Sequence, residues 1–256
     1  MSTALFDKVI FGPVKSRRLG VSLGVNLLLP SAKLCNFDCI YCECGWNRDS
    51  PGGAFNKKEE VLEILSQIIE KMVGEGTPPD YITFAGNGEP TMHPDFEEII
   101  EGTLAVRDRL ASGAKVAVLT NSTMLHRESV KRALKRVDKA MLKLDSAFDA
   151  TMQVMNQPLG RRSVEETVAL MESLEGDFVI QTMFLRGEYN GVSFDNTTKE
   201  EVVAWLELIA RLRPREVMLY SIDRDTPHSD LVKITRDELL DIAREVEGLG
   251  ISVSVS

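Results

Sequence analysis

Short apolar segments alternate with amphipathic helical patterns along most of this chain, at intervals of roughly 30 residues. Seven of these segments are predicted strands, at residues 21–29, 81–85, 114–119, 139–144, 177–185, 216–222 and 251–255. Six predicted helices lie between them, at residues 57–73, 96–110, 127–137, 163–174, 198–212 and 235–248. Strands joined by helical crossovers build right-handed βαβ units around a parallel sheet. The pattern therefore predicts an α/β fold, either a barrel-like closure or an open doubly wound sheet.

The rest of the composition predicts one domain in a reducing compartment. The 256 residues contain no repeat, low-complexity segment or linker, so we expect a single domain over residues 1–256, with residues 1–20 as a lead-in segment. No apolar run approaches the roughly 20 residues of a membrane span. The first residues show no signal-peptide pattern, and all four cysteines lie close together in the chain, which predicts a cytoplasmic protein without a disulfide framework.

The cysteines fall in one stretch at residues 34–45, L-C-N-F-D-C-I-Y-C-E-C-G, directly after the first predicted core strand. Cys35, Cys39 and Cys42 have the spacing C-x3-C-x2-C, and Cys44 follows. Thiolates this close together can turn toward one soft metal centre. Four of them could close a structural zinc site, although such sites usually join two separated pairs. Three ligands and an open metal position suit a 4Fe–4S cluster, which we favour.

Polar or glycine-rich residues follow most of the other predicted strands. The second strand leads into G-N-G-E-P at residues 86–90, and the next two lead to Asn121 and to Lys143 and Asp145. In parallel α/β folds, binding sites are built at the carboxyl ends of the strands. We therefore expect these residues to meet the cysteine stretch at one edge of the sheet.

The cysteine spacing, the aromatic residue before the third cysteine and G-N-G-E-P together resemble the radical S-adenosylmethionine (SAM) enzymes. The resemblance implies a partial (β/α)6 TIM-type barrel with a final added strand, and a 4Fe–4S cluster on Cys35, Cys39 and Cys42. It also implies that the fourth iron chelates SAM, and that reductive cleavage produces a 5′-deoxyadenosyl radical that abstracts hydrogen from a substrate. Such an oxidoreductase needs a one-electron reductant protein of the flavodoxin or ferredoxin type.

The same resemblance implies which residues contact the cofactor. Tyr41 would touch the adenine, and the turn at Gly86, Asn87, Gly88 and Glu89 would bind the ammonium group. Contacts to the ribose, the carboxylate and the adenine would come from later strand ends, at Asn121, Lys143, Asp145, Gln181, Ser221 and Ile222. For these later residues, capping or loop hydrogen bonds are an equal alternative.

Four segments narrow the resemblance to a subgroup related to wyosine-type tRNA synthases: F-G-P-V-K-S-R-R-L-G, C-N-F-D-C-I-Y-C, G-N-G-E-P-T-M-H-P-D-F and Y-S-I-D-R-D-T-P. A net charge of −9 and a pI near 5.0 argue against a nucleic-acid substrate. Local basic residues at Lys15, Arg17 and Arg18, and at Arg161 and Arg162, could bind an anion or be ordinary solvated charges.

Several alternatives remain at this level. The substrate could be a small metabolite or a modified nucleotide, a glycyl-radical partner protein or a tRNA base, and a zinc-binding scaffold is the non-enzymatic alternative. Cys44 is a candidate catalytic residue, as a hydrogen donor to a product radical, but it could also bind substrate or have no function.

Overall fold

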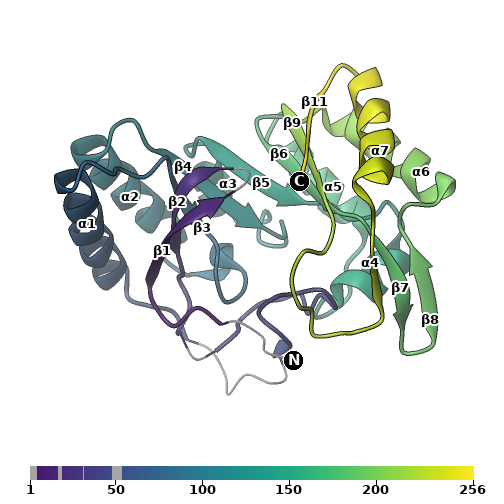
Figure 1. The fold of residues 1–256 in the computed structure, drawn as a ribbon, viewed down its shortest axis with the longest axis horizontal. Coiled ribbons are helices and arrows are strands. Elements are labelled where there is room, and N and C mark those ends of the chain that lie inside the picture. Colours follow the sequence, from purple (N-terminus) through teal and green to yellow (C-terminus); the bar gives the residue numbers. More distant parts are fainter. Residues whose placement is uncertain (1–4, 17–18, 31, 48–53) are drawn as a thin grey trace.

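The computed structural model describes residues 5–16, 19–30, 32–47 and 54–256, and its centre is one eight-stranded sheet (Figure 1). The strand order is β1-β2-β3-β4-β5-β6-β9-β11, in which β1 is antiparallel to β2 and every other neighbouring pair is parallel. The strands are β1 (Ile10–Ser16), β2 (Gly20–Val25), β3 (Tyr81–Phe84), β4 (Lys115–Thr120), β5 (Lys139–Lys143), β6 (Val179–Met183), β9 (Glu216–Tyr220) and β11 (Ser252–Val255). This order confirms the predicted partial (β/α)6 barrel with a final strand.

Helices connect the parallel strands and cover the outer face of the curved sheet (Figure 1). They are α1 (Lys58–Gly74), α2 (Phe96–Leu110), α3 (Glu128–Leu134), α4 (Asp149–Asn156), α5 (Val164–Glu172), α6 (Lys199–Leu212) and α7 (Arg236–Gly248), with a short 3-10 turn at Pro90–Met92. Within the described residues, none of these helices has the length and apolarity to cross a bilayer.

Two-residue alternation along the strands divides the core into two layers. Ile82, Val116 and Leu142 belong to the large cluster that also includes apolar residues of the surrounding helices. Met141 and Met218, at alternate positions, pack instead with Leu19 in a separate cluster. This second cluster, called the inner cluster below, lies inside the barrel. A cavity lies at the carboxyl ends of the strands.

The structure differs from the expected fold mainly in the segment after β6. The predicted strand 177–185 ends at Met183, and a separate hairpin follows, formed by β7 (Leu185–Tyr189) and β8 (Val192–Asp195). Together with β10 (Leu231–Lys233), it forms a second sheet of order β10-β7-β8. The turn residues Asn190 and Gly191 both have positive φ, 52° and 78°, as a tight two-residue hairpin requires. Helix α4 was also not predicted.

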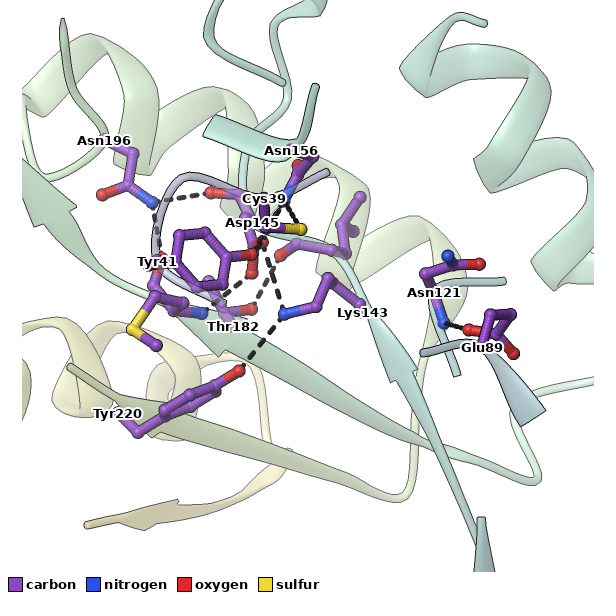
Figure 2. Close-up of polar contacts among 12 residues, drawn as sticks. Cys39, Tyr41, Glu89, Asn121, Lys143, Asp145, Asn156, Thr182, Asn196 and Tyr220 are labelled. Carbon is purple, nitrogen blue, oxygen red and sulfur yellow. Dashed lines mark hydrogen bonds and ion pairs between the residues drawn. The ribbon is translucent and has the colours of Figure 1, made fainter. Parts of the chain in front are cut away.

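Asn196 fastens this hairpin to the barrel (Figure 2). Its side-chain NH₂ donates to the carbonyl oxygens of Asp145, at 2.7 Å, and Met183, at 2.8 Å. Its Oδ1 accepts from the Leu185 N–H at 2.9 Å, and the residue is almost fully buried. One amide thus satisfies three backbone groups where the chain leaves the sheet.

Replacing Asn196 with alanine should lower the free energy of unfolding by about 2–3 kcal/mol, because three buried backbone groups lose their partners. Urea unfolding of the two proteins measures the difference. Ser193→Ala, at an exposed position of the same hairpin, is the control and should change the stability by less than about 0.5 kcal/mol. Equal stability of Asn196→Ala and the unmodified protein would contradict the assigned role.

Candidate active site

A cavity of about 550 Å³ opens at the carboxyl ends of the parallel strands. All four cysteines line it, and so do several of the predicted strand-end residues. Much of the remaining wall is apolar, with Leu119, Met141, Met183 and Met218 among its residues. The cavity therefore brings together the thiols, a small number of polar groups and a largely apolar space, as expected for a small-molecule site.

The cysteine loop, residues 34–45, is attached to the glycine-rich turn by a backbone bridge. The Leu34 N–H donates to the Asn87 carbonyl at 2.9 Å, and the Glu89 N–H donates to the Leu34 carbonyl at 3.1 Å. Between these bonds lies Gly88, with φ of 142°. A Cβ atom there would lie 1.9 Å from the Leu34 carbonyl oxygen, so only glycine fits.

Glu89, whose N–H makes the second of these bridge bonds, is 2% exposed. Its Oε1 accepts from the Thr91 N–H at 3.1 Å and from the hydroxyls of Thr91 and Thr120. Its Oε2 accepts from the Asn121 N–H at 2.7 Å and receives no other bond from the described residues. Burial raises the pKa of Glu89, and these donors oppose that shift. The carboxylate faces the cavity with acceptor capacity left on Oε2.

Asn121 holds the start of the cysteine loop from the end of β4. Its Nδ2 donates to Asn36 Oδ1 at 2.8 Å and contacts Cys35 Sγ at 3.6 Å. Its Oδ1 accepts from the Thr123 N–H and hydroxyl. Asn121 lines the cavity as predicted, but its hydrogen-bonding groups serve the loop.

Asp145 and Asn156 hold the middle of the same loop (Figure 2). Asp145 Oδ2 accepts from the Tyr41 hydroxyl and, at 2.8 Å, from Asn156 Nδ2, while its Oδ1 accepts from the Met183 N–H at 2.9 Å. Asn156 Nδ2 also contacts Cys39 Sγ at 3.6 Å. Burial first, and then the Asp145 charge, raise the pKa of Tyr41, so its phenol remains a proton donor. Asn156 was not identified from the sequence, because it lies in the unpredicted helix α4.

Lys143 extends from the end of β5 into the cavity between two aromatic rings (Figure 2). Its Nζ lies 5.0 Å from the Tyr41 ring centre and 5.9 Å from that of Tyr220, and it donates to the Tyr220 hydroxyl at 3.3 Å. Asp145 Oδ2 is 3.5 Å away. Burial alone would lower the pKa of Lys143, but the Asp145 carboxylate, together with the interaction with Tyr220, outweighs it and raises the pKa. The ammonium group is therefore a permanent cation in the cavity wall.

A second buried cation, Lys33, directly precedes the cysteine loop and bonds two of its residues, and it was not identified from the sequence. Its side chain is 1% exposed, and its Nζ donates to Asp38 Oδ1 at 3.0 Å and to the Gly45 carbonyl. Burial alone would lower the pKa of Lys33, but Cys42 and Asp38 raise it above the ordinary value. Because Lys33 is only two positions before Cys35, that proximity was the one available sequence signal.

The four thiols have different electrostatic environments. Burial raises the pKa of Cys35 and raises that of Cys39 to about 11. Hydrogen bonds from Cys44 and Lys33 stabilise the Cys42 thiolate and lower its pKa to about 6, although burial opposes them. The same contact raises the pKa of Cys44, whose Sγ also lies 3.3 Å from the Gly86 carbonyl oxygen, the alternative acceptor for its single hydrogen. Cys44 thus supports a neighbouring thiolate by remaining protonated.

Some predicted cofactor residues lie elsewhere than expected. The Asn87 side chain does not line the cavity: its Oδ1 accepts from the Phe6 N–H at 2.8 Å, and its Nδ2 donates to the Phe6 carbonyl at 2.9 Å. Asp145 likewise does not line this cavity, and both of its carboxylate oxygens accept the hydrogen bonds described above. Ser221 lines the cavity, but its hydroxyl donates to the Phe184 carbonyl and accepts from the Ile234 N–H. These positions resemble cofactor contacts in sequence because they follow strands. Asn87 and Ser221 bond backbone groups distant in the chain, whereas Asp145 bonds mainly side chains.

The other predicted residues border the cavity, namely Tyr41, Gly86, Gly88, Glu89, Asn121, Lys143, Gln181 and Ile222. Gln181 is 6% exposed, and its side-chain amide has no hydrogen-bond partner among the described residues. A buried amide facing a cavity without a protein partner is a group that a ligand can satisfy. Of the proposed basic segment at residues 15–18, Arg17 and Arg18 lie outside the described residues.

The thiols meet the requirements of an iron–sulfur cluster. Among the described residues, no three cysteine, histidine, aspartate or glutamate side chains converge on a point where one ion could bind. A 4Fe–4S cluster instead takes each thiolate on a different iron, so its protein ligands stay apart while facing one space. Cys35, Cys39 and Cys42 all border the same cavity, which suits that arrangement.

Comparison with known proteins shows the family of this chain. A family model described as the radical SAM superfamily matches residues 29–191. The chain is 30% identical to the UPF0026 protein of Helicobacter pylori strain J99 over 251 residues, 96% of this chain and 76% of that one. It is also 30% identical to a UPF0026 protein of Synechocystis over 247 residues, 94% of this chain and 80% of that one.

Solved structures share the fold at low identity. A radical SAM methyltransferase from Sphaerobacter thermophilus superposes with a TM-score of 0.70 at 14% identity, over 92% of this chain and 65% of that one. SuiB from Streptococcus suis, bound to SAM, gives 0.61 at 12% identity, over 88% and 49%. Archaeal TYW1 gives 0.54 at 17% identity, over 89% and 71%. The likeness to TYW1 concerns the fold alone, so the wyosine-related subgroup stays a prediction.

Replacing Gly88 with alanine should displace the cysteine loop, because the added Cβ collides with the Leu34 carbonyl. We expect a loss of about 2 kcal/mol or more in unfolding free energy and a large drop in iron bound after anaerobic reconstitution. Gly248→Ala is the matched control, since nothing lies within 4 Å of a Cβ there. Full iron content and stability in Gly88→Ala would show that the bridge is dispensable.

Replacing Lys33 with methionine should destabilise the cluster-free protein by about 3 kcal/mol, because Asp38 and the Gly45 carbonyl lose a buried donor. Urea unfolding measures the loss. The double variant Lys33→Met/Asp38→Asn, which removes the unpaired charge but keeps an acceptor for the Asn47 N–H, should recover part of it. An unchanged midpoint in the single variant would contradict the buried ion pair.

Proposed function

The chain belongs to the radical SAM superfamily, and from this we propose that it is an enzyme that cleaves SAM reductively and abstracts hydrogen from a substrate held in the barrel. Members of the superfamily use a 4Fe–4S cluster and SAM. When bound, these cofactors supply a 5′-deoxyadenosyl radical as the hydrogen-abstracting agent. The observation that carries the proposal is that three thiols spaced C-x3-C-x2-C border one cavity together with the buried Glu89 carboxylate.

In this proposal Cys35, Cys39 and Cys42 hold the cluster, and the chain prepares them for that task. The Asn121 amide contacts the Cys35 sulfur, the Asn156 amide contacts the Cys39 sulfur, and Lys33 and Cys44 bond the Cys42 sulfur. Each ligand therefore has a polar hydrogen already directed at it. Hydrogen bonds to ligand sulfurs stabilise their negative charge, which helps to set the potential at which a cluster accepts an electron.

The remaining cavity residues divide between cofactor and substrate. Glu89 has an acceptor site on Oε2 for the ammonium group of SAM, and the Lys143 ammonium is placed for its carboxylate. Tyr41 borders the same space, with its hydroxyl held by Asp145. Gln181 and the methionines of the inner cluster border the part that we assign to the substrate. An apolar wall there excludes water from the reacting carbon.

The test is anaerobic reconstitution followed by reduction. We expect about four iron and four sulfide per chain, and 5′-deoxyadenosine after addition of dithionite and SAM. Alanine at Cys35, Cys39 or Cys42 should abolish both the bound cluster and the product. Cys44→Ala is the matched control within the same loop and should retain the cluster. One tightly bound zinc without SAM cleavage would instead support a metal-binding scaffold.

A further inference from the structure

The loop between α4 and α5, residues 157–162, lies against the cysteine loop on the side away from the cavity. The Leu159 N–H donates to the Asn36 carbonyl at 2.8 Å, and Pro158 forms a β-bridge with Phe37. None of residues 157–162 borders the cavity. Asn36 is the covalent neighbour of Cys35, and the Phe37 N–H donates to Cys35 Sγ at 3.4 Å. The Asp38 N–H also donates to the Gln157 carbonyl at 3.1 Å. Two backbone hydrogen bonds therefore connect this surface loop to the cysteine loop, and one of them is made by the residue next to a proposed cluster ligand.

The loop presents an apolar tip and two arginines. Leu159 is 63% exposed, more than any other large aliphatic side chain in the described part of the chain. Arg161 is exposed and Arg162 is half-buried, and neither forms an ion pair with a described carboxylate. Nearby acidic groups are already engaged: Asp149 accepts from the Val164 N–H, and Glu166 belongs to the capping box of α5.

The other flank of Asn36 is also basic. Asn36 Nδ2 donates to the Thr123 hydroxyl at 2.5 Å, in the turn that carries His126 and Arg127. His126 is exposed, and Arg127 is half-buried without an ion pair to a described carboxylate. In a chain of net charge −9, arginines without a described ion pair thus lie on both sides of the backbone that leads to Cys35, Arg161 and Arg162 on one side and Arg127 on the other. Such a local field attracts an acidic partner that the protein as a whole would repel.

We propose that Leu159, Arg161 and Arg162 form the docking surface for an acidic one-electron carrier protein, which reduces the cluster through the Asn36–Cys35 backbone. The carrier loses one electron and the cluster gains it, with no bond made or broken. An exposed leucine followed closely by two arginines suits a protein partner, whose small interface has an apolar centre and a charged rim. This inference rests on the proposed function and adds its electron donor and entry point.

The experiment compares two reductants on the reconstituted enzyme. Reduction of the cluster is followed by stopped-flow absorbance with photoreduced flavodoxin and, separately, with dithionite. For the double charge reversal Arg161→Glu/Arg162→Glu at low salt, we expect reduction by flavodoxin to slow about tenfold or more. Added salt should slow the unmodified enzyme and have much less effect on the variant. Reduction by dithionite should be unchanged.

Lys135→Glu/Arg213→Glu is the matched control. Both positions are exposed, and neither forms an ion pair with a described carboxylate. They precede the amino ends of β5 and β9, whereas the cysteine loop lies at the carboxyl ends of the strands. This variant makes the same change in net charge and should keep the unmodified rate. Leu159→Ser tests the apolar tip and should slow flavodoxin severalfold, whereas Leu249→Ser, at another exposed leucine, should not.

Flavodoxin reduction of Arg161→Glu/Arg162→Glu at the unmodified rate would overturn the docking surface. So would an equal loss in the control variant, which would make the effect one of total charge. Salt-sensitive tRNA binding that disappears in Arg161→Glu/Arg162→Glu, without a change in flavodoxin reduction, would assign the surface to nucleic acid instead. Failure of dithionite to reduce a cluster in the unmodified protein would reject the proposed function itself, and the docking surface with it.

Discussion

The backbone bridge between Leu34 and Gly88 is the contact on which the site depends. It joins the cysteine loop to the end of β3 through two hydrogen bonds at a separation that excludes any side chain at Gly88. Because Glu89 is the next residue, the same bridge fixes the buried carboxylate beside the thiols. Glycine at this position is therefore explained by loop packing, before any cofactor is considered. A turn that looks like a cofactor motif in sequence is first a joint between two segments of backbone.

The polar residues at the strand ends fall into two groups, according to whether their hydrogen-bonding groups already have partners in the protein. Buried polar groups need partners, and those of Asn121, Asp145 and Ser221 find them in the protein, where they hold the cysteine loop or the later strands in place. Glu89 Oε2 and the Gln181 amide keep capacity that no described residue uses. The positions that hold the loop and the positions that can hold a ligand are thus chemically distinct, although both follow strands in the sequence.

Periodicity alone located most of the barrel, and helix α2 has the predicted bounds. The β7–β8 hairpin was missed, although Asn190-Gly191 between apolar residues is a strong hairpin signal; the buried run that precedes it was extended into a longer strand instead. Other misses had no local signal. Asn87 bonds Phe6, distant in the chain, and Lys33 is stabilised by the Gly45 carbonyl at the far end of the cysteine loop. Contacts of that kind exist only once the loop has folded.

The cysteine loop acts as a wall between two environments. On one side are the apolar cavity and the Lys143 cation, while on the other side the Asn36 carbonyl meets a surface with an exposed leucine and unpaired arginines. Under the proposed function, a radical generated in the cavity has to be kept from solvent, whereas an electron donor has to approach from solvent. Those two demands conflict if they are met on one face. Placing the thiols in a thin loop with backbone contacts to the outside reconciles them, since an electron can cross a few bonds that a substrate or a water molecule cannot.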